Sequence, residues 1–249
     1  MDFDRINPVA LISGATHGAG AACAQPIAYG AQGGLILIDR DAAALDALAD
    51  KLGEEGVAPE RVSMLTHEDA EDPQWWERVG AFVKDHYGRL DWAVINACAP
   101  QADDGALVDF RRDGGPHMQA AALALRTALP LMRFNNQGGA IVVIAPAAAL
   151  KADPGLLQLI RTAAKDSAED NIRINAIALG PAPGAIQSFE DIARDTGSER
   201  AAFEIIANLT PPLARYPSGG DLNRLLLALL TDAAPVTGTT LVVDGGYTL

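Results

Sequence analysis

Three glycines and one aspartate near the N-terminus have the types and the spacing needed to bind a dinucleotide. Gly14, Gly18 and Gly20 follow the apolar run 9–12, and Asp39 ends the next apolar run, 19 residues after Gly20. Glycine permits a tight turn and lets the backbone approach a pyrophosphate, which then faces the amides at the start of a helix. An acidic residue after the second strand accepts hydrogen bonds from an adenosine ribose and disfavours the extra phosphate of NADP. The pattern indicates an NAD site; the alternative is that the glycines serve turn geometry alone.

The elements that position these residues can be predicted from the distribution of apolar residues. Seven short apolar runs are expected to be strands: 9–12, 35–38, 62–65, 92–95, 140–144, 172–177 and 240–243. Because the runs are continuous rather than alternating, they are typical of a parallel sheet that is covered on both faces. Helix candidates lie between them, at 42–52, 73–87 and 220–231.

We therefore expect a single α/β domain spanning 1–249. Its sheet is predicted to be Rossmann-like and doubly wound, with about seven parallel strands and helices on both faces. A loop-and-helix insertion at about 181–217 is expected to cover the cleft, because that stretch is rich in proline and glycine near its start.

Composition excludes several classes of partner. The chain has 249 residues and a formal net charge of −13, which argues against nucleic acid or an anionic membrane surface. The two cysteines and four histidines show no metal-ligand spacing. That spacing predicts no metal site. No apolar run has the length of a membrane span, and we expect the acidic N-terminus not to be a signal peptide, so we expect a cytoplasmic protein.

The chain resembles the short-chain dehydrogenase/reductase family along nearly its whole length. Residues 13–20 match the family's Thr-Gly-x-x-x-Gly-x-Gly pattern with serine for threonine, and 95–98, 172–175 and 242–246 match later landmarks. The resemblance implies cofactor contacts by a dozen residues. These are Gly14, Thr16, His17, Gly18, Ala19, Gly20, Asp39, Arg40, Asp69, Ala70, Asn96 and Ala97.

The residues that perform this family's chemistry are missing. The family uses a tyrosine as general acid/base, a lysine four residues later, a serine and an asparagine. Here no tyrosine lies between Tyr87 and Tyr216, and no tyrosine has a lysine four positions later. Pro146 occupies the serine position and His117 the asparagine position. We therefore expect no catalytic residues of the usual kind.

The losses are expected to extend to the helices and to the nicotinamide end of the site. About ten residues are missing between the fifth and sixth strands, and the segment 113–116 is a poor helix, so both helices should be shortened at the active-site end. Cys98 replaces a family glycine, Gly184 replaces a threonine, and Pro26 interrupts the first helix. NAD binding is therefore expected to be weak or vestigial.

A few remaining side chains could be assigned catalytic roles, but we expect each of them to have an ordinary structural or surface role. We expect His17 to be exposed, Cys98 to be a buried small side chain, and Lys151 and Arg161 to be solvated. The pair Trp75 and Trp76 should pack their helix on the sheet.

The surfaces that this family uses for assembly are retained, namely the fourth and fifth helices and the last helix and strand. The resemblance therefore implies a pseudoenzyme that forms a hetero-oligomer, expected to be a tetramer, with an active NAD-dependent paralogue. The family includes such pairs, for example a two-subunit hydroxyacyl-CoA dehydrogenase of anaerobic toluene (benzylsuccinate) degradation, and the chain resembles the inactive subunit. Two alternatives stay open: an oxidoreductase or lyase with relocated chemistry at His117, and a module that senses NAD(H) or a metabolite.

Overall fold

The computed structural model describes residues 7–67, 69–97, 114–147, 154–180, 197–200, 211–231 and 235–249. The strands are β1 (Val9–Ser13), β2 (Gly34–Asp39), β3 (Val62–Thr66), β4 (Trp92–Asn96), β5 (Gly139–Pro146), β6 (Ile172–Leu179) and β7 (Thr240–Val243). The helices are α1 (Gly18–Gly30), α2 (Ala42–Glu54), the short 3-10 helix η1 (Pro59–Arg61), α3 (Pro73–Tyr87), α4 (Gly114–Phe134), α6 (Pro154–Asp166) and α9 (Gly219–Leu230).

The strands form one parallel sheet in the order β3-β2-β1-β4-β5-β6-β7, which confirms the predicted doubly wound architecture. The chain builds outward from β1 to β3 and then returns to place β4 on the other side of β1. The direction of winding therefore reverses between β1 and β4. In such sheets, ligands bind at this point, beyond the carboxyl ends of the strands.

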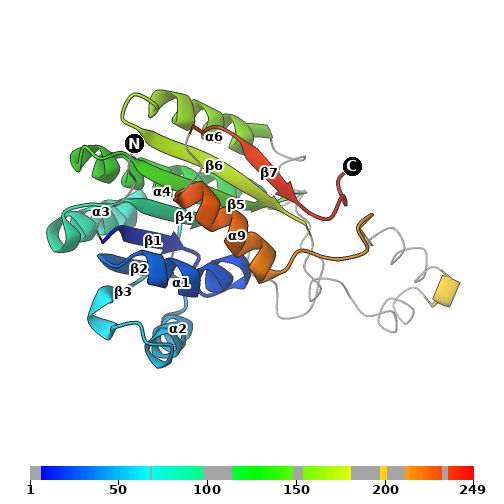
Figure 1. Cartoon of the computed structure of the whole chain (residues 1–249), viewed down its shortest axis with the longest axis horizontal. Helices are drawn as coiled ribbons and strands as arrows, with labels where there is room; N and C mark the ends of the chain where they lie inside the picture. The colour runs from blue at the N-terminus through cyan, green and yellow to red at the C-terminus, as the bar shows by residue number, and fades with distance from the viewer. Residues whose placement is uncertain are drawn as a thin grey trace.

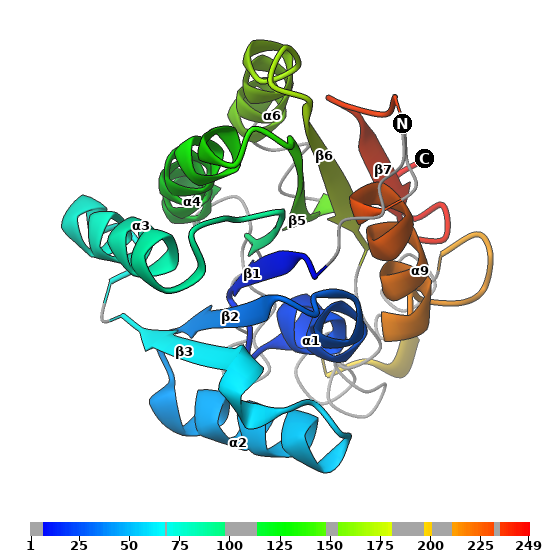
Figure 2. The ribbon, with the colours of Figure 1, turned by 60° about the vertical axis from the view of Figure 1, so that its left-hand side comes forward.

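Helices cover both faces of the sheet (Figures 1 and 2): α3, α4 and α6 lie on one face, and α1, α2 and α9 on the other. Side chains alternate between the two layers along each strand. Val9 and Leu11 of β1 pack on the side of α3, α4 and α6, whereas Ala10 and Ile12 pack on the side of α1 and α9. Both faces of each inner strand are thus buried, which explains why the strands are continuously apolar.

The first and last helices pack against each other on the same face. Cys23 and Ile27 of α1 share one buried cluster with Leu222 and Leu226 of α9. The Nδ2 atom of Asn223 donates a hydrogen bond of 2.9 Å to the carbonyl of Ala22. Helix α9 therefore covers α1, although about two hundred residues separate them in the chain.

Helix α3 shows how the sequence specifies its own ends. The side chain of Asp72 accepts a hydrogen bond from the Gln74 amide at 2.8 Å, and Pro73 occupies the first turn. Gly88 ends the helix in the left-handed conformation. Trp75 and Trp76 are buried in the layer between α3 and the sheet, as predicted.

One helix differs from its prediction. Helix α4 begins at Gly114, so the expectation that the segment 113–116 shortens its start is wrong. The reason is that amides of the first helical turn have no carbonyl partner within the helix, so Pro116 removes no hydrogen bond there. Pro26 does lie inside α1, as expected.

Most of the expected insertion at 181–217 lies outside the described residues. Among the helices that the structure does describe, none combines the length and apolarity needed to cross a membrane.

Candidate functional site

The glycine loop joins β1 to α1 at the reversal point of the sheet. Gly14 has a φ of +69°, a conformation that suits glycine, and its amide donates to the carbonyl of Ile38 on β2 at 2.9 Å. A Cβ on Gly20 would overlap the Gly14 carbonyl oxygen and lie 2.9 Å from its carbon. The turn and the start of the helix therefore touch backbone to backbone, and only glycine allows this contact.

Gly18 has a different role in the same loop. Its φ is +46°, and a Cβ placed on it would meet nothing within 4 Å. The backbone at the N-terminus of α1 therefore borders open space, where amides and the helix dipole favour an anion. A phosphate group of a dinucleotide fits this cradle.

Asp39 ties the glycine loop to the end of β2. Asp39 is only 5% exposed, and its carboxylate accepts hydrogen bonds from the amides of Thr16 at 2.9 Å and Arg40 at 2.7 Å. The Nδ1 atom of His17 lies 3.6 Å from the same carboxylate. Burial alone would raise the pKa of Asp39, but the hydrogen bonds from Thr16 and Arg40 and the nearby His17 outweigh burial, and the pKa is lowered. The group is therefore an anion at neutral pH.

Asn96 fixes the loop from the other side. Its Nδ2 atom donates to the carbonyl of Gly14 at 3.0 Å and to the carbonyl of His17 at 3.4 Å. The next residue, Ala97, is buried and donates its amide to the carbonyl of Ile144 on β5 at 2.8 Å. The carboxyl ends of β1, β2 and β4 thus meet around one loop.

The structure therefore brings most of the predicted cofactor residues together. Nine of them lie on or beside this loop: Gly14, Thr16, His17, Gly18, Ala19, Gly20, Asp39, Arg40 and Asn96. His17 and Arg40 are exposed, as expected for His17. Asp69 and Ala70 lie in the turn after β3, where Asp69 is exposed and Ala70 accepts a hydrogen bond from the indole of Trp76 at 2.8 Å.

His67 is a member of this region that the sequence analysis did not select. Its amide donates to the carbonyl of Asp39 at 3.3 Å, and its ring meets Trp75 edge to face at 5.0 Å. Burial lowers the pKa of His67, although the carboxylates of Asp39 and Asp69 act in the opposite direction. The signal that could have found it is its position directly after β3, on the sheet edge that Asp39 also occupies.

The structure describes two of the positions that the resemblance assigns to catalysis, Pro146 and His117. Pro146 ends β5 and pairs in register with Leu179 of β6. Its ring carries no exchangeable proton. His117 lies in the first turn of α4. Cys98, Lys151 and Gly184 lie outside the described residues. Arg161 is on the exposed surface of α6, as expected.

A pocket of about 570 Å³ lies at the opposite edge of the sheet from β3, at the carboxyl end of β7. Asp221 accepts hydrogen bonds there from Arg215 at 2.9 Å and Arg224 at 2.7 Å. Hydrogen bonds from Ser218 and then Arg215 lower the pKa of Asp221. The cations of this pocket are thus already paired, and none of the predicted site residues lines it. The described residues also hold no group of three histidine, cysteine or acidic side chains arranged for a metal.

Known proteins resemble the chain along almost its full length. The sequence model of the family described as enoyl-(acyl carrier protein) reductase matches residues 14–248. The trans-4-hydroxycyclohexanecarboxylate dehydrogenase of Sinomonas cyclohexanicum is 31% identical over 265 residues, which covers 98% of this chain and 95% of that protein. The L-rhamnose 1-dehydrogenase (NAD(P)(+)) of Azotobacter vinelandii is 28% identical and covers 97% of this chain and 96% of its own.

Solved structures agree with these sequence matches. The L-sorbose reductase of Gluconobacter frateurii, solved with NADPH and L-sorbose, has a TM-score of 0.77 and 25% identity and covers 97% of each chain. The two chains therefore share one fold along almost their whole length.

Proposed function

The chain belongs to the short-chain dehydrogenase/reductase family of oxidoreductases, and from this premise we propose that it is a non-catalytic subunit. In this proposal the chain assembles with an active NAD-dependent paralogue and supports hydride transfer by that partner. The paralogue is the subunit that oxidises the substrate, a hydroxyacyl-CoA. One observation carries the proposal: no tyrosine lies between Tyr87 and Tyr216, and no serine lies between Ser63 and Ser167. The named relatives are dehydrogenases and reductases, so the loss concerns this chain and not the family.

The chemical argument is about proton transfer. An alcohol substrate must lose a proton as it loses a hydride, and in this family a tyrosine accepts that proton. A phenol has an ordinary pKa of about 10, so it serves as a base near neutral pH only when a nearby cation lowers its pKa. Pro146, at the end of β5, offers neither a donor nor an acceptor on its side chain. Among the described residues, no side chain with an exchangeable proton replaces it at that strand end.

The adenosine end of the site fits a dinucleotide better than the catalytic end fits an alcohol. The open cradle at Gly18 suits the pyrophosphate, and the anionic Asp39 suits a ribose hydroxyl. A bound nicotinamide cofactor would supply the hydride acceptor. Because both oxygens of Asp39 already accept amides of this chain, the ribose must share them, and we expect weak binding.

The proposal is tested by tagging the chain in its native host, purifying it under mild conditions and determining the masses of the complex and its subunits. The expected result is a tetramer that contains this chain and a second family member, whose own sequence has the catalytic serine, tyrosine and lysine. Recovery of homo-oligomers alone would contradict the proposal.

A kinetic experiment separates relocated chemistry from loss of chemistry. The purified chain is assayed with NAD and a panel of secondary alcohols and hydroxyacyl-CoA thioesters, beside a His117→Ala variant. We expect no turnover by either protein. Turnover that the His117→Ala change abolishes would place the chemistry at His117 and overturn the proposal. Stoichiometric NADH binding without turnover or partner would instead favour a sensor.

A further inference from the structure

Helix α1 contains a proline at a position where a regular helix uses an amide. Pro26 lies inside α1, and in a regular helix the amide of residue 26 would donate to the carbonyl of Ala22, one turn earlier. Proline has no amide hydrogen, so it removes this hydrogen bond. Because α9 covers α1 here, the carbonyl of Ala22 then needs a donor from elsewhere in the protein.

The missing donor comes from the neighbouring helix. The Nδ2 atom of Asn223 in α9 donates to the carbonyl of Ala22 at 2.9 Å, and this is the carbonyl that Pro26 leaves without its helical partner. The two helices are in close contact at this point, since a Cβ added to Gly219 would lie 3.4 Å from the Cβ of Ala22. Asn223 thus replaces, across the helix interface, the amide that Pro26 lacks.

The surroundings of Asn223 would otherwise favour an apolar residue. Its neighbours Leu222 and Leu226 are buried in the cluster that joins α9 to α1, and asparagine is a weaker helix former than leucine. The Oδ1 atom of Asn223 is buried and accepts no hydrogen bond from the described residues, which costs free energy. An asparagine is therefore unfavourable here unless its amide is needed as a donor, and the carbonyl of Ala22 needs it.

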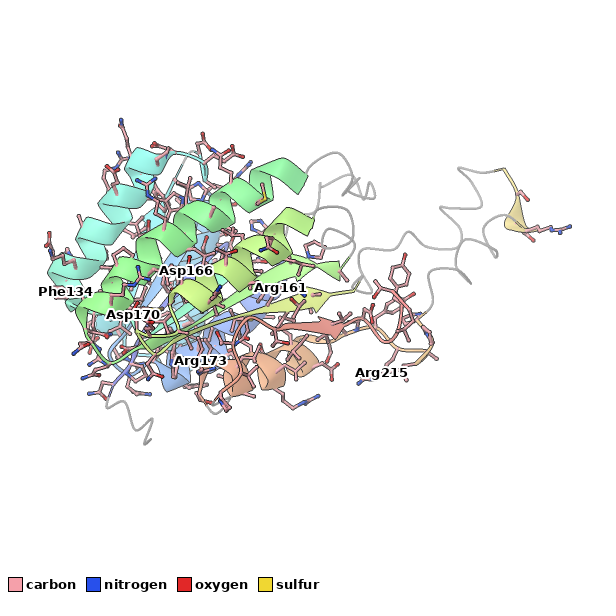
Figure 3. The ribbon with its side chains drawn as sticks, turned by 90° about the horizontal axis from the view of Figure 1, so that it is seen from above. Phe134, Arg161, Asp166, Asp170, Arg173 and Arg215 are labelled. Atoms are coloured by element: carbon pink, nitrogen blue, oxygen red, sulfur yellow. The ribbon has the colours of Figure 1, made fainter. Side chains whose placement is uncertain are left out.

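Helix α9 is held at both ends, so it provides a fixed support for α1. In its first turn, Asp221 pairs with Arg215 at 2.9 Å and belongs to a capping box. At the other end, Arg173 of β6 donates to the carbonyl of Leu230 at 3.0 Å. Figure 3 shows these two arginines toward opposite ends of α9. The position of Asn223 is therefore fixed by contacts other than those with α1.

The hydrogen bond to Ala22 lies one turn from the anion cradle. Helix α1 begins at Gly18, and the amides that face a phosphate belong to this first turn. The same turn touches the glycine loop backbone to backbone, because a Cβ on Gly20 would overlap the carbonyl oxygen of Gly14. A bond that fixes the carbonyl of Ala22 therefore also fixes the direction in which the first-turn amides point.

We propose that Asn223 is a positioning residue for dinucleotide binding. It donates the hydrogen bond that Pro26 cannot donate, and so holds the first turn of α1 in the orientation that a phosphate group requires. The inference rests on the proposed dinucleotide binding and not on the proposed partner subunit. It gives α9, which contains none of the predicted cofactor residues, a part in the nucleotide site.

The test is a double-mutant cycle on the full chain, with Asn223→Leu, Pro26→Ala and the two changes together. Leucine has a similar size but no donor, whereas Pro26→Ala restores the backbone amide. Hydrogen exchange of the amides of residues 20–25 and the dissociation constant for NADH, by ligand-observed NMR, are measured for each protein. Asn223→Leu is expected to raise both roughly fivefold when Pro26 is kept, the effect of about one hydrogen bond. In the Pro26→Ala background it should change neither.

The matched control is Pro130→Ala, which makes the same change at the proline inside α4. Asn223→Leu should keep its full effect in this background, because the carbonyl of Ala22 still lacks its helical donor. If Asn223→Leu lowers the melting temperature too far for exchange to be measured, Asn223→Ala replaces it in every arm of the cycle.

Three outcomes would overturn the inference. The first is an equal effect of Asn223→Leu with and without Pro26→Ala, which would make the two residues independent. The second is faster exchange with an unchanged dissociation constant for NADH, which would limit Asn223 to support of the fold. The third is a parent chain that binds no NADH. A native complex with a partner subunit can be recovered or absent in each case, so this inference and the proposed assembly fail separately.

Discussion

Replacing Gly20 by alanine tests the backbone contact on which the glycine loop depends. The added Cβ would overlap the Gly14 carbonyl oxygen, lie 2.9 Å from the carbonyl carbon, and lie 3.1 Å from Nδ2 of Asn96. Neither of the first two atoms is at the end of a flexible side chain, so α1 must move away from β1. Overpacking of this kind costs about 1–3 kcal/mol in the free energy of unfolding, and backbone contacts place the expected value near ~3 kcal/mol.

The matched control is Gly53→Ala in the last turn of α2, where an added Cβ meets nothing within 4 Å. Alanine is the better helix former, so this change should stabilise the protein by about 0.5 kcal/mol. Both proteins are measured by urea unfolding with tryptophan fluorescence. The reasoning is refuted if the two alanines have the same effect on the free energy of unfolding.

Three further changes test other contacts of the described fold. Asp91 is fully buried, accepts the Val9 amide and pairs with Arg89, so Asp91→Ala should lower the free energy of unfolding in urea by about 3 kcal/mol; a loss under 1 kcal/mol would argue against that role. The pKa of Asp39 is lowered in the folded state, so in acid the unfolded chain binds more protons than the folded chain. Asp39 therefore stabilises the fold above about pH 4, and this contribution is lost as the pH falls through the folded-state pKa. Asp39→Asn should therefore lose less stability than the parent between pH 5 and pH 3, and equal losses would exclude this linkage. Arg173 donates to the last carbonyls of α9, so Arg173→Met should destabilise by about 2 kcal/mol and speed hydrogen exchange in α9; unchanged exchange there would count against the contact.

The sequence predicted the structure best at positions where local geometry or burial restricts the residue to one or a few types. The continuous apolar runs predicted the parallel sheet, because strands buried on both faces cannot alternate with polar residues. Asp72 and Pro73 start α3, and Gly88 ends it, at the residues where the sequence analysis placed its limits. Gly20 was assigned by spacing, and the structure gives its reason, the close contact with Gly14.

The sequence was least informative where a side chain's role depends on distant neighbours. That Asp39 accepts amides of this chain depends on where the loop at Thr16 lies, which no local pattern specifies. His67 has an ordinary position in the sequence, and only the pairing of β2 with β3 brings it to Asp39. The start of α4 was predicted wrongly because helix propensity was applied to a first turn, where proline removes no hydrogen bond.

The contact between α1 and α9 affects how the protein folds during synthesis. Strands β1 to β4 and the glycine loop are complete once residue 97 has left the ribosome, but the surface of α1 that α9 covers stays bare until residue 230 has been added. The bond from Asn223 to Ala22 closes a loop of 201 residues, and contacts of such long range form slowly. The nascent chain therefore presents an apolar helix surface for most of its translation, a stage at which chaperones would act.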